Sequence, residues 1–211
     1  MIELEPQPCL KGNEPLLTVD GPYGDDRGAA TVKDFWSWAY SRLRADVTRG
    51  VLAEFIVARL IGSDLGVPAS PDREFDLKTA SGRTVEVKSS AYWQDWETRR
   101  PNAPSFSGLM GKEFTMGAGF AEKAAYAADL FVFCVLGKNA AEPPRALVNP
   151  LDLEQWQFHV LTRADLEADG EPGRLSLAGV RRLAKDACVT EDAHVGWRDL
   201  RAHVEAAQRR L

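Results

Sequence analysis

The segment VEVK at residues 85–88 shows the clearest alternation of apolar and polar positions in the chain. A period of two is typical of a strand with one buried face. Glu86 and Lys88 then share one face of a sheet, and the two valines share the other. The preceding residues 75–78 (FDLK) alternate in the same way, which predicts a second strand and a hairpin between the two.

The turn of this hairpin decides which residues face each other. Residues 80–82 (ASG) fit a three-residue loop with glycine in the left-handed conformation. Such a loop pairs Leu77 with Val85, so the apolar faces of the two strands coincide. It also places Asp76 directly opposite Glu86. A two-residue loop would put Leu77 opposite Glu86, and we reject it for that reason.

The rest of the pattern predicts helices around a buried sheet. Helices are expected at 32–43, 48–61, 121–128 and through much of the chain after 162, and strands at 130–136 and 156–161. The apolar run LFVFCVL at 130–136 is typical of a strand buried on both faces. We therefore predict an α/β domain with a mixed central β-sheet flanked by helices, and a helical C-terminal appendage that packs on the sheet.

Two of the predicted helices carry more apolar residues than one face requires. The aromatic residues of 32–43 cluster, which favours a place in the core. The helix at 48–61, with Thr48 as a plausible N-cap, is apolar nearly all round and is expected to be buried on most sides. Glu54 lies within that apolar surface. Because burying an unpaired carboxylate is costly, Glu54 needs either an arginine, such as Arg49 or Arg59, or a metal ion.

Composition and charge add bounds to this picture. A chain of 211 residues with 45% hydrophobic residues suits one globular domain. We divide it into an extended acidic leader at 1–30, an α/β core at 31–165 and the helical appendage at 166–211. The net charge of −5 resides mostly in the leader, which has two bases and six acids. The remaining chain is close to neutral, which gives only weak electrostatic support for a nucleic-acid partner.

The sequence lacks the signatures of several classes of protein. The cysteines, Cys9, Cys134 and Cys188, are widely spaced, which predicts a reducing, cytoplasmic setting without disulfides. No apolar run approaches the roughly 20 residues of a membrane span. No P-loop, GxGxxG, GxSxG or HExxH motif is present, so nucleotide-binding, hydrolase-triad and zinc-protease interpretations have no support.

The candidate chemistry follows from the hairpin. Carboxylates opposite each other on a sheet repel, and a divalent cation between Asp76 and Glu86 would relieve that repulsion. Mg²⁺ binds hard oxygen ligands, typically one or two carboxylates together with water and substrate phosphate. Lys88 is placed to orient or deprotonate a metal-bound water, or to neutralise a phosphate. The alternative interpretation is an exposed hairpin in which Lys88 only pairs with the two acids.

Asp76 followed after nine residues by Glu86-Val87-Lys88 resembles the PD-(D/E)xK superfamily of restriction-endonuclease-like phosphodiesterases. The resemblance covers roughly residues 48–136, and the string EVKSSAYWQDW also resembles a little-described bacterial branch of that superfamily. It implies that Asp76 and Glu86 are metal ligands, that Lys88 is the catalytic lysine, and that Glu54 faces them from the first core helix as a third ligand. The literal Pro71-Asp72 makes Asp72 the alternative first acid.

The resemblance implies a Mg²⁺-dependent deoxyribonuclease, in which Mn²⁺ substitutes, acting as an endonuclease on the phosphodiester bonds of DNA. Two further residues, Gln94 and Ser89, are weaker candidates for contact with the substrate. A homodimer is compatible with this function, and a membrane partner is not expected. The alternative function is a non-catalytic DNA-binding or interaction module on a nuclease-like fold.

Overall fold

The computed structural model describes residue 11 and residues 31–66, 74–95, 100–112, 114–115, 119–170, 172–186 and 194–211. The expected leader therefore lies almost wholly outside the described residues. The alternative first acid Asp72 lies outside them too, as do Cys9 and Cys188. None of the described helices combines the length and the apolar character that crossing a membrane requires.

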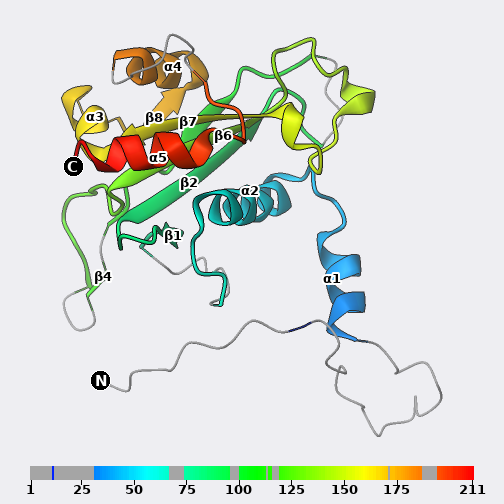
Figure 1. The fold of residues 1–211 in the computed structure, drawn as a ribbon, viewed down its shortest axis with the longest axis horizontal. Coiled ribbons are helices and arrows are strands. Elements are labelled where there is room, and N and C mark those ends of the chain that lie inside the picture. The colour runs from blue at the N-terminus through cyan, green and yellow to red at the C-terminus, as the bar shows by residue number, and fades with distance from the viewer. Residues whose placement is uncertain are drawn as a thin grey trace, which may run out of the picture.

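A mixed four-stranded sheet in the order β1-β2-β6-β7 forms the centre of the fold (Figure 1). Its strands are β1 (Leu77–Lys78), β2 (Thr84–Ala91), β6 (Leu130–Leu136) and β7 (Trp156–Thr162). The β2–β6 pair is parallel, whereas β1 and β7 run antiparallel to their neighbours. The predicted mixed α/β architecture is confirmed.

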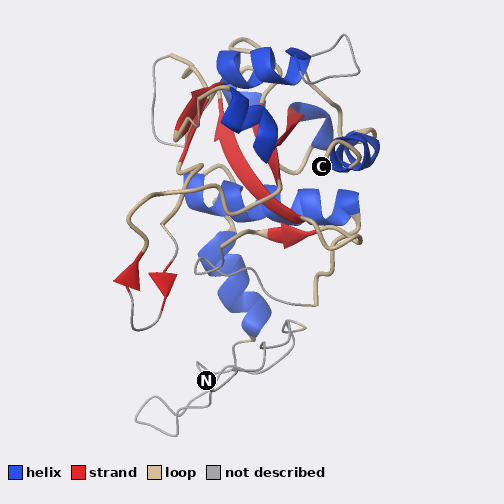
Figure 2. Cartoon of the chain, turned by 90° about the vertical axis from the view of Figure 1, so that its left-hand side faces the viewer, coloured by secondary structure: helices blue, strands red, loops and turns tan. Residues whose placement is uncertain are grey.

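Helices and short strand pairs surround this sheet (Figure 2). The helices are α1 (Val32–Tyr40), α2 (Asp46–Ile61), α3 (Arg163–Ala168), α4 (Leu177–Asp186) and α5 (Leu200–Gln208). Strand β3 (Ser105–Ser107) pairs with β8 (Arg174–Ser176), and β4 (Phe114–Thr115) pairs with β5 (Gly119–Phe120). Two 3₁₀ turns, η2 (Arg145–Leu147) and η3 (Leu153–Gln155), precede β7.

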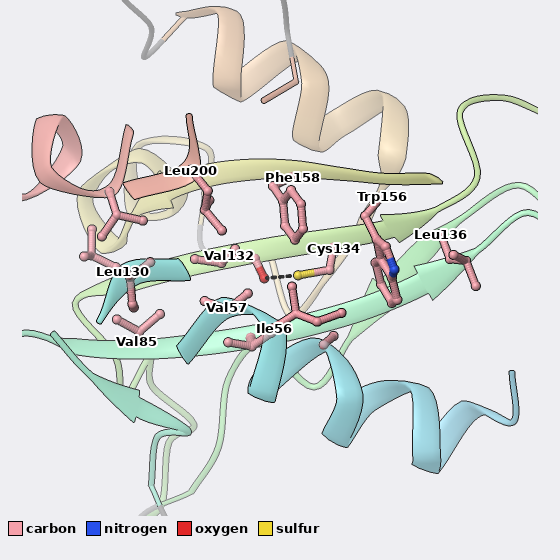
Figure 3. Packing of buried hydrophobic residues seen from close by; sticks show 14 of the residues in the cluster. Ile56, Val57, Val85, Leu130, Val132, Cys134, Leu136, Trp156, Phe158 and Leu200 are labelled. Carbon is pink, nitrogen blue, oxygen red and sulfur yellow. Dashed lines mark hydrogen bonds between the residues drawn. The ribbon is translucent and has the colours of Figure 1, made fainter. Parts of the chain in front are cut away.

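Each face of the sheet carries its own hydrophobic cluster. Helices α2 and α5 cover one face, where Val57 and Leu200 meet Val85 and Val132 (Figure 3). Helices α3 and α4 and the β3–β8 pair cover the other face. Every residue of β6 is buried, as its continuous apolar run predicts. The helices of 166–211 pack on the sheet as expected, and they supply part of both core layers.

The hairpin has the predicted register. Leu77 pairs with Val85, and the Thr79 N–H donates to the Arg83 carbonyl at 2.9 Å. Gly82 closes the loop with φ of 85°, in the left-handed region. Strand β1 ends after two residues whereas β2 continues for eight. In the described chain, most of this edge of β2 therefore has no strand beside it.

Three local predictions are wrong. Helix α2 begins at Asp46 behind Ala45, so Thr48 is not its N-cap. Residues 121–128 form no helix, because Ala125 pairs with Gly111 through two backbone hydrogen bonds of 2.8 and 3.0 Å, and tertiary pairing overrides a weak helical preference. The third wrong prediction concerns burial. The aromatic residues of α1 are exposed, and so are Val47, Val51 and Phe55 of α2. An apolar pattern does not specify which surface covers the apolar side chains.

Candidate functional site

Asp76 lies at the point where β1 leaves β2. Its backbone N–H donates to the Val85 carbonyl at 3.1 Å, and its Oδ2 accepts the Val87 N–H at 2.6 Å. The carboxylate therefore takes the place of a further strand residue and satisfies a backbone donor on the open edge of β2. This bond fixes the carboxylate of Asp76 beside Glu86, as the hairpin register predicts.

Glu86 and Lys88 project from β2 as successive residues of one face. Lys88 Nζ and Glu86 Oε1 form an ion pair at 2.6 Å, and their side chains are 24% and 17% exposed. Both groups can therefore be reached by solvent or a ligand. The charge of Lys88 also acts on Asp76 and Glu54, where it opposes the net rise in the pKa of each carboxyl group. Lys88 is thus the described cation whose charge acts on all three acids.

Glu54 comes to the site from helix α2. Ala53 and Val57, its neighbours along the helix, pack against the sheet, so Glu54 is carried to the rim of this contact and is partly buried. Within the described residues it forms no ion pair. Arg49, one of its two expected arginine partners, is bound elsewhere, and the other, Arg59, is exposed. The charges that act on Glu54 are instead those of Asp76, Glu86 and Lys88 in the hairpin.

All three acids have a raised pKa, and burial is the first cause in each case. Burial, and then the charges of Asp76 and Glu86, raise the pKa of Glu54 to about 7. Burial also raises the pKa of Asp76, against the opposing effects of the Val87 N–H and Lys88. The pKa of Glu86 is raised by burial and by Asp76, although Lys88 opposes the shift. The charge of Asp76 thus acts on both Glu54 and Glu86, which places these carboxylates within electrostatic range of one another at this edge of β2.

These groups fit a cation that keeps much of its own water. In the part of the chain that the structure describes, no three His, Cys, Asp or Glu side chains are grouped closely enough to form a ready-made metal cage. Mg²⁺ does not require such a cage, since it commonly binds one or two carboxylates and completes its shell with water and phosphate. The Val87 N–H occupies Oδ2 of Asp76, and a carboxylate offers a second oxygen. Asp76, Glu86 and Glu54 are therefore the residues suited to hold this ion.

Ser89 and Gln94 belong to a different cluster, organised by Arg49 of α2. Arg49 is 3% exposed; its Nε donates to Ser89 Oγ at 3.2 Å and its Nη1 to Gln94 Oε1 at 3.1 Å. Further bonds run to the Arg44 carbonyl at 3.1 Å and to Asp46 Oδ1 at 2.7 Å. The polar atoms of Ser89 and Gln94 are thus used in anchoring α2 to the end of β2, and their contact with a substrate stays a prediction.

Sequence reasoning missed the role of Arg49. The available signal was its position on an otherwise apolar helix, where a buried cation needs several acceptors. Those acceptors are Ser89 and Gln94, some forty residues further along the chain, so pairing them with Arg49 required the packing of α2 on β2. The grouping of Asp76, Glu86 and Lys88 was accessible because a single hairpin contains all three.

Neither a protein-family model nor a curated protein matches the sequence. Among solved structures, the chain is similar to a bacterial homing endonuclease, I-Ssp6803I, with a TM-score of 0.34 and 15% sequence identity. The match covers 65% of this chain and 77% of that chain. A likeness of this size shows no family.

Proposed function

We propose that this chain is a metal-dependent nuclease that hydrolyses phosphodiester bonds of DNA as an endonuclease. One observation carries the proposal: Asp76 and Glu86 lie on the open edge of β2 within electrostatic range of Glu54, and Lys88 is the described cation whose charge acts on all three acids. Crowded carboxylates destabilise a fold unless a ligand offsets their repulsion. A divalent cation with a phosphate offsets it with the chemistry that phosphodiester cleavage needs.

The residues take distinct roles in this proposal. Asp76, held by the Val87 N–H, and Glu86 would hold Mg²⁺, or Mn²⁺ in its place, and Glu54 would complete the set directly or through water. The ion supplies Lewis acidity and a lowered pKa for bound water. Lys88 exchanges its pairing with Glu86 for the substrate, where it neutralises a phosphate oxygen or orients the attacking water. Partial exposure of Glu86 and Lys88 supports this exchange.

A non-catalytic DNA-binding or interaction module is the second candidate function. The observation that favours it is the Lys88–Glu86 ion pair at 2.6 Å, which satisfies one of the acids without any metal. Under this alternative the cluster is only a charged surface of the hairpin. The two functions differ in whether a divalent cation binds at Asp76 and Glu86, and a titration separates them.

Calorimetric titration with Mn²⁺ and Mg²⁺, repeated with a non-cleavable duplex oligonucleotide present, tests the proposal. Asp76→Asn keeps an acceptor for the Val87 N–H and Glu86→Gln keeps the shape of its side chain, so each removes charge with little change of packing. We expect both variants to lose metal binding and nicking of plasmid DNA. The control Glu167→Gln, at an exposed position of α3, should retain both. Absence of metal binding by the wild type in both titrations contradicts the proposal and favours the non-catalytic module.

A further inference from the structure

A polar hollow lies where the turn of the β1–β2 hairpin meets the end of α5. Its volume is about 470 Å³, and it opens to solvent. The end of α5, marked C in Figure 1, lies beside the start of β2. The side chains that line the hollow therefore come from two elements far apart in the sequence. They are Ser81, Arg83, Glu205, Gln208 and Arg209.

Hydrogen bonds hold the two sides of this hollow together. Ser81 Oγ donates to Gln208 Oε1 at 3.0 Å, which ties the hairpin turn to α5. The Arg83 backbone is fixed to Thr79, because its N–H donates to Thr79 Oγ1 at 3.2 Å and its carbonyl accepts the Thr79 N–H at 2.9 Å. The backbone of the turn therefore holds Arg83 in one position relative to the end of α5.

Two arginines give the hollow a net positive charge. Arg83 and Arg209 are exposed, and within the described residues neither side chain forms an ion pair or a hydrogen bond. The neighbouring Arg210, by contrast, pairs with Asp165 at 2.9 Å. Glu205 is the one acid among the described lining residues, so two cations stand against one carboxylate. Because like charges repel, an anion between the two arginines would be stabilising.

The side chains of the hollow suit a phosphate group. Arginine presents a planar fork of N–H donors that matches the oxygens of a phosphate, and Ser81 and Gln208 add polar groups beside it. The centre of a protein interface ordinarily supplies aromatic or aliphatic anchors, and the described lining contains none. The chemistry therefore favours a phosphate of a nucleic-acid backbone over an acidic segment of a protein.

The place of the hollow relates it to the three acids of the candidate site. Arg83 precedes Glu86 by three residues, which is on the order of 10 Å along a strand. Arg83 also shares with Val85 the side of the hairpin that α2 and α5 cover, and Glu54 comes to the site from α2. Phosphates of one DNA strand follow each other about every 3.4 Å along the helix axis. A strand bound at the acids would thus reach the hollow about three phosphates away.

We propose that this hollow binds a phosphate of the DNA backbone, and that Arg83 and Arg209 position the strand that is cleaved at the three acids. The inference rests on the proposed function, because it names a second contact with the same substrate. A contact with the backbone alone adds affinity without reading the base sequence. The two arginines lie away from the reacting atoms, so they are positioning residues and should support binding of substrate and transition state equally.

Fluorescence anisotropy with a labelled, non-cleavable duplex tests this contact, first with Mg²⁺ and again with EDTA in its place. Arg83→Met and Arg209→Met should each weaken binding by about 10-fold at low salt. The double variant should reduce the slope of log affinity against log salt concentration by about 0.9, the value for one phosphate. Glu205→Gln removes the acid of the hollow and should strengthen binding by about 2- to 5-fold. Lys185→Met, at an exposed position of α4, is the matched control and should bind as the wild type does.

Plasmid nicking and metal titration supply a second readout. Arg83→Met should raise KM and leave kcat unchanged, because it removes binding that the substrate and the transition state share. It should also bind Mg²⁺ and Mn²⁺ as the wild type does, since Arg83 holds no metal in this proposal. Circular dichroism and thermal unfolding of each variant establish that the fold is retained.

The outcomes separate the hollow from the nuclease activity. Wild-type duplex binding by both arginine variants overturns the phosphate contact even if the chain cleaves DNA, and an acidic protein partner would then fit the hollow better. An equal loss of binding in Lys185→Met overturns it too, because the attraction would come from the charge of the whole chain. A wild type that binds no duplex, with or without Mg²⁺, also overturns it. Arginine-dependent duplex binding by a chain that binds no divalent cation would support the hollow and overturn the proposed nuclease activity.

Discussion

Two polar clusters lie between helix α2 and strand β2, and they differ in whether their charges are balanced. Toward the start of α2, Arg49 is almost fully buried and donates to four acceptors, one of them the carboxylate of Asp46. Further along the helix, Glu54 is within electrostatic range of the carboxylates of Asp76 and Glu86, and Lys88 is the described cation that acts on it. The first cluster is satisfied within the chain, whereas the second carries an excess of negative charge.

This difference separates a structural role from a functional one. A buried cation with all its partners ties α2 to the end of β2, and its removal leaves polar groups without partners. Burial of these carboxylates, together with the charge of another acid beside Glu54 and Glu86, costs stability, and the raised pKa values of the three carboxylates express that cost. Groups that a fold keeps at such a cost are candidates for binding a ligand. Variants in the two clusters should therefore change different properties of the protein.

The largest expected effect is on catalysis in the acidic cluster. Lys88→Ala should lower the rate of DNA cleavage by about 10²–10⁴-fold, the usual contribution of a positioned proton-transfer group, with little change in stability because Lys88 is partly exposed. Plasmid nicking with Mg²⁺ measures the rate. Lys78→Ala, an exposed lysine of the same hairpin, is the control and should cut normally. Wild-type cleavage by Lys88→Ala would remove Lys88 from the mechanism.

The next effect is on stability in the satisfied cluster. Arg49→Met fills a similar volume but leaves Ser89 and Gln94 without their donor, which should lower the free energy of unfolding by about 1–3 kcal/mol. Urea denaturation followed by circular dichroism measures it. Arg59→Met, at an exposed position of the same helix, should change stability by no more than about 0.5 kcal/mol. If the two variants are equally stable, Arg49 does not anchor α2 as the hydrogen bonds indicate.

The sequence was most informative where a structure is formed by neighbours along the chain. The period of two, the ASG loop and the fit of apolar faces determined the pairing of Leu77 with Val85, and with it the approach of Asp76 to Glu86. The unbroken apolar run at 130–136 indicated a central strand for the same reason. These are short-range constraints, and a single register satisfied all of them.

Features that depend on distant packing were not accessible in the same way. The aromatic pattern of α1 predicted a covered helix, but the described chain leaves Trp38 exposed, since a pattern cannot say which surface does the covering. The fate of Ser89 and Gln94 depended on where Arg49 would lie. The sequence identified Glu54 as an acid in apolar surroundings. The charged residues that act on it, Asp76, Glu86 and Lys88, depend on how α2 packs against the hairpin.

The last expected effect is the change of stability with pH that Glu54 contributes. The pKa of Glu54 is about 7 in the folded chain against 4.5 ordinarily, so the folded state holds a proton that the unfolded state releases. The free energy of unfolding should therefore fall as pH rises from about 4.5 to about 7. Glu54→Gln is neutral at every pH and removes this contribution. Its stability relative to wild type should grow across that window to a gain of about 1–3 kcal/mol.

Thermal or urea unfolding at several pH values, without divalent metal, measures this gain. Asp76 and Glu86 also have raised pKa values, so Glu54→Gln should flatten the pH dependence without abolishing it. Glu205→Gln, at an exposed position of α5, should track the wild type throughout. A Glu54→Gln variant that is less stable than wild type at neutral pH would mean that Glu54 has a stabilising partner within the chain. In that case the acidic cluster would be structural, like the cluster around Arg49.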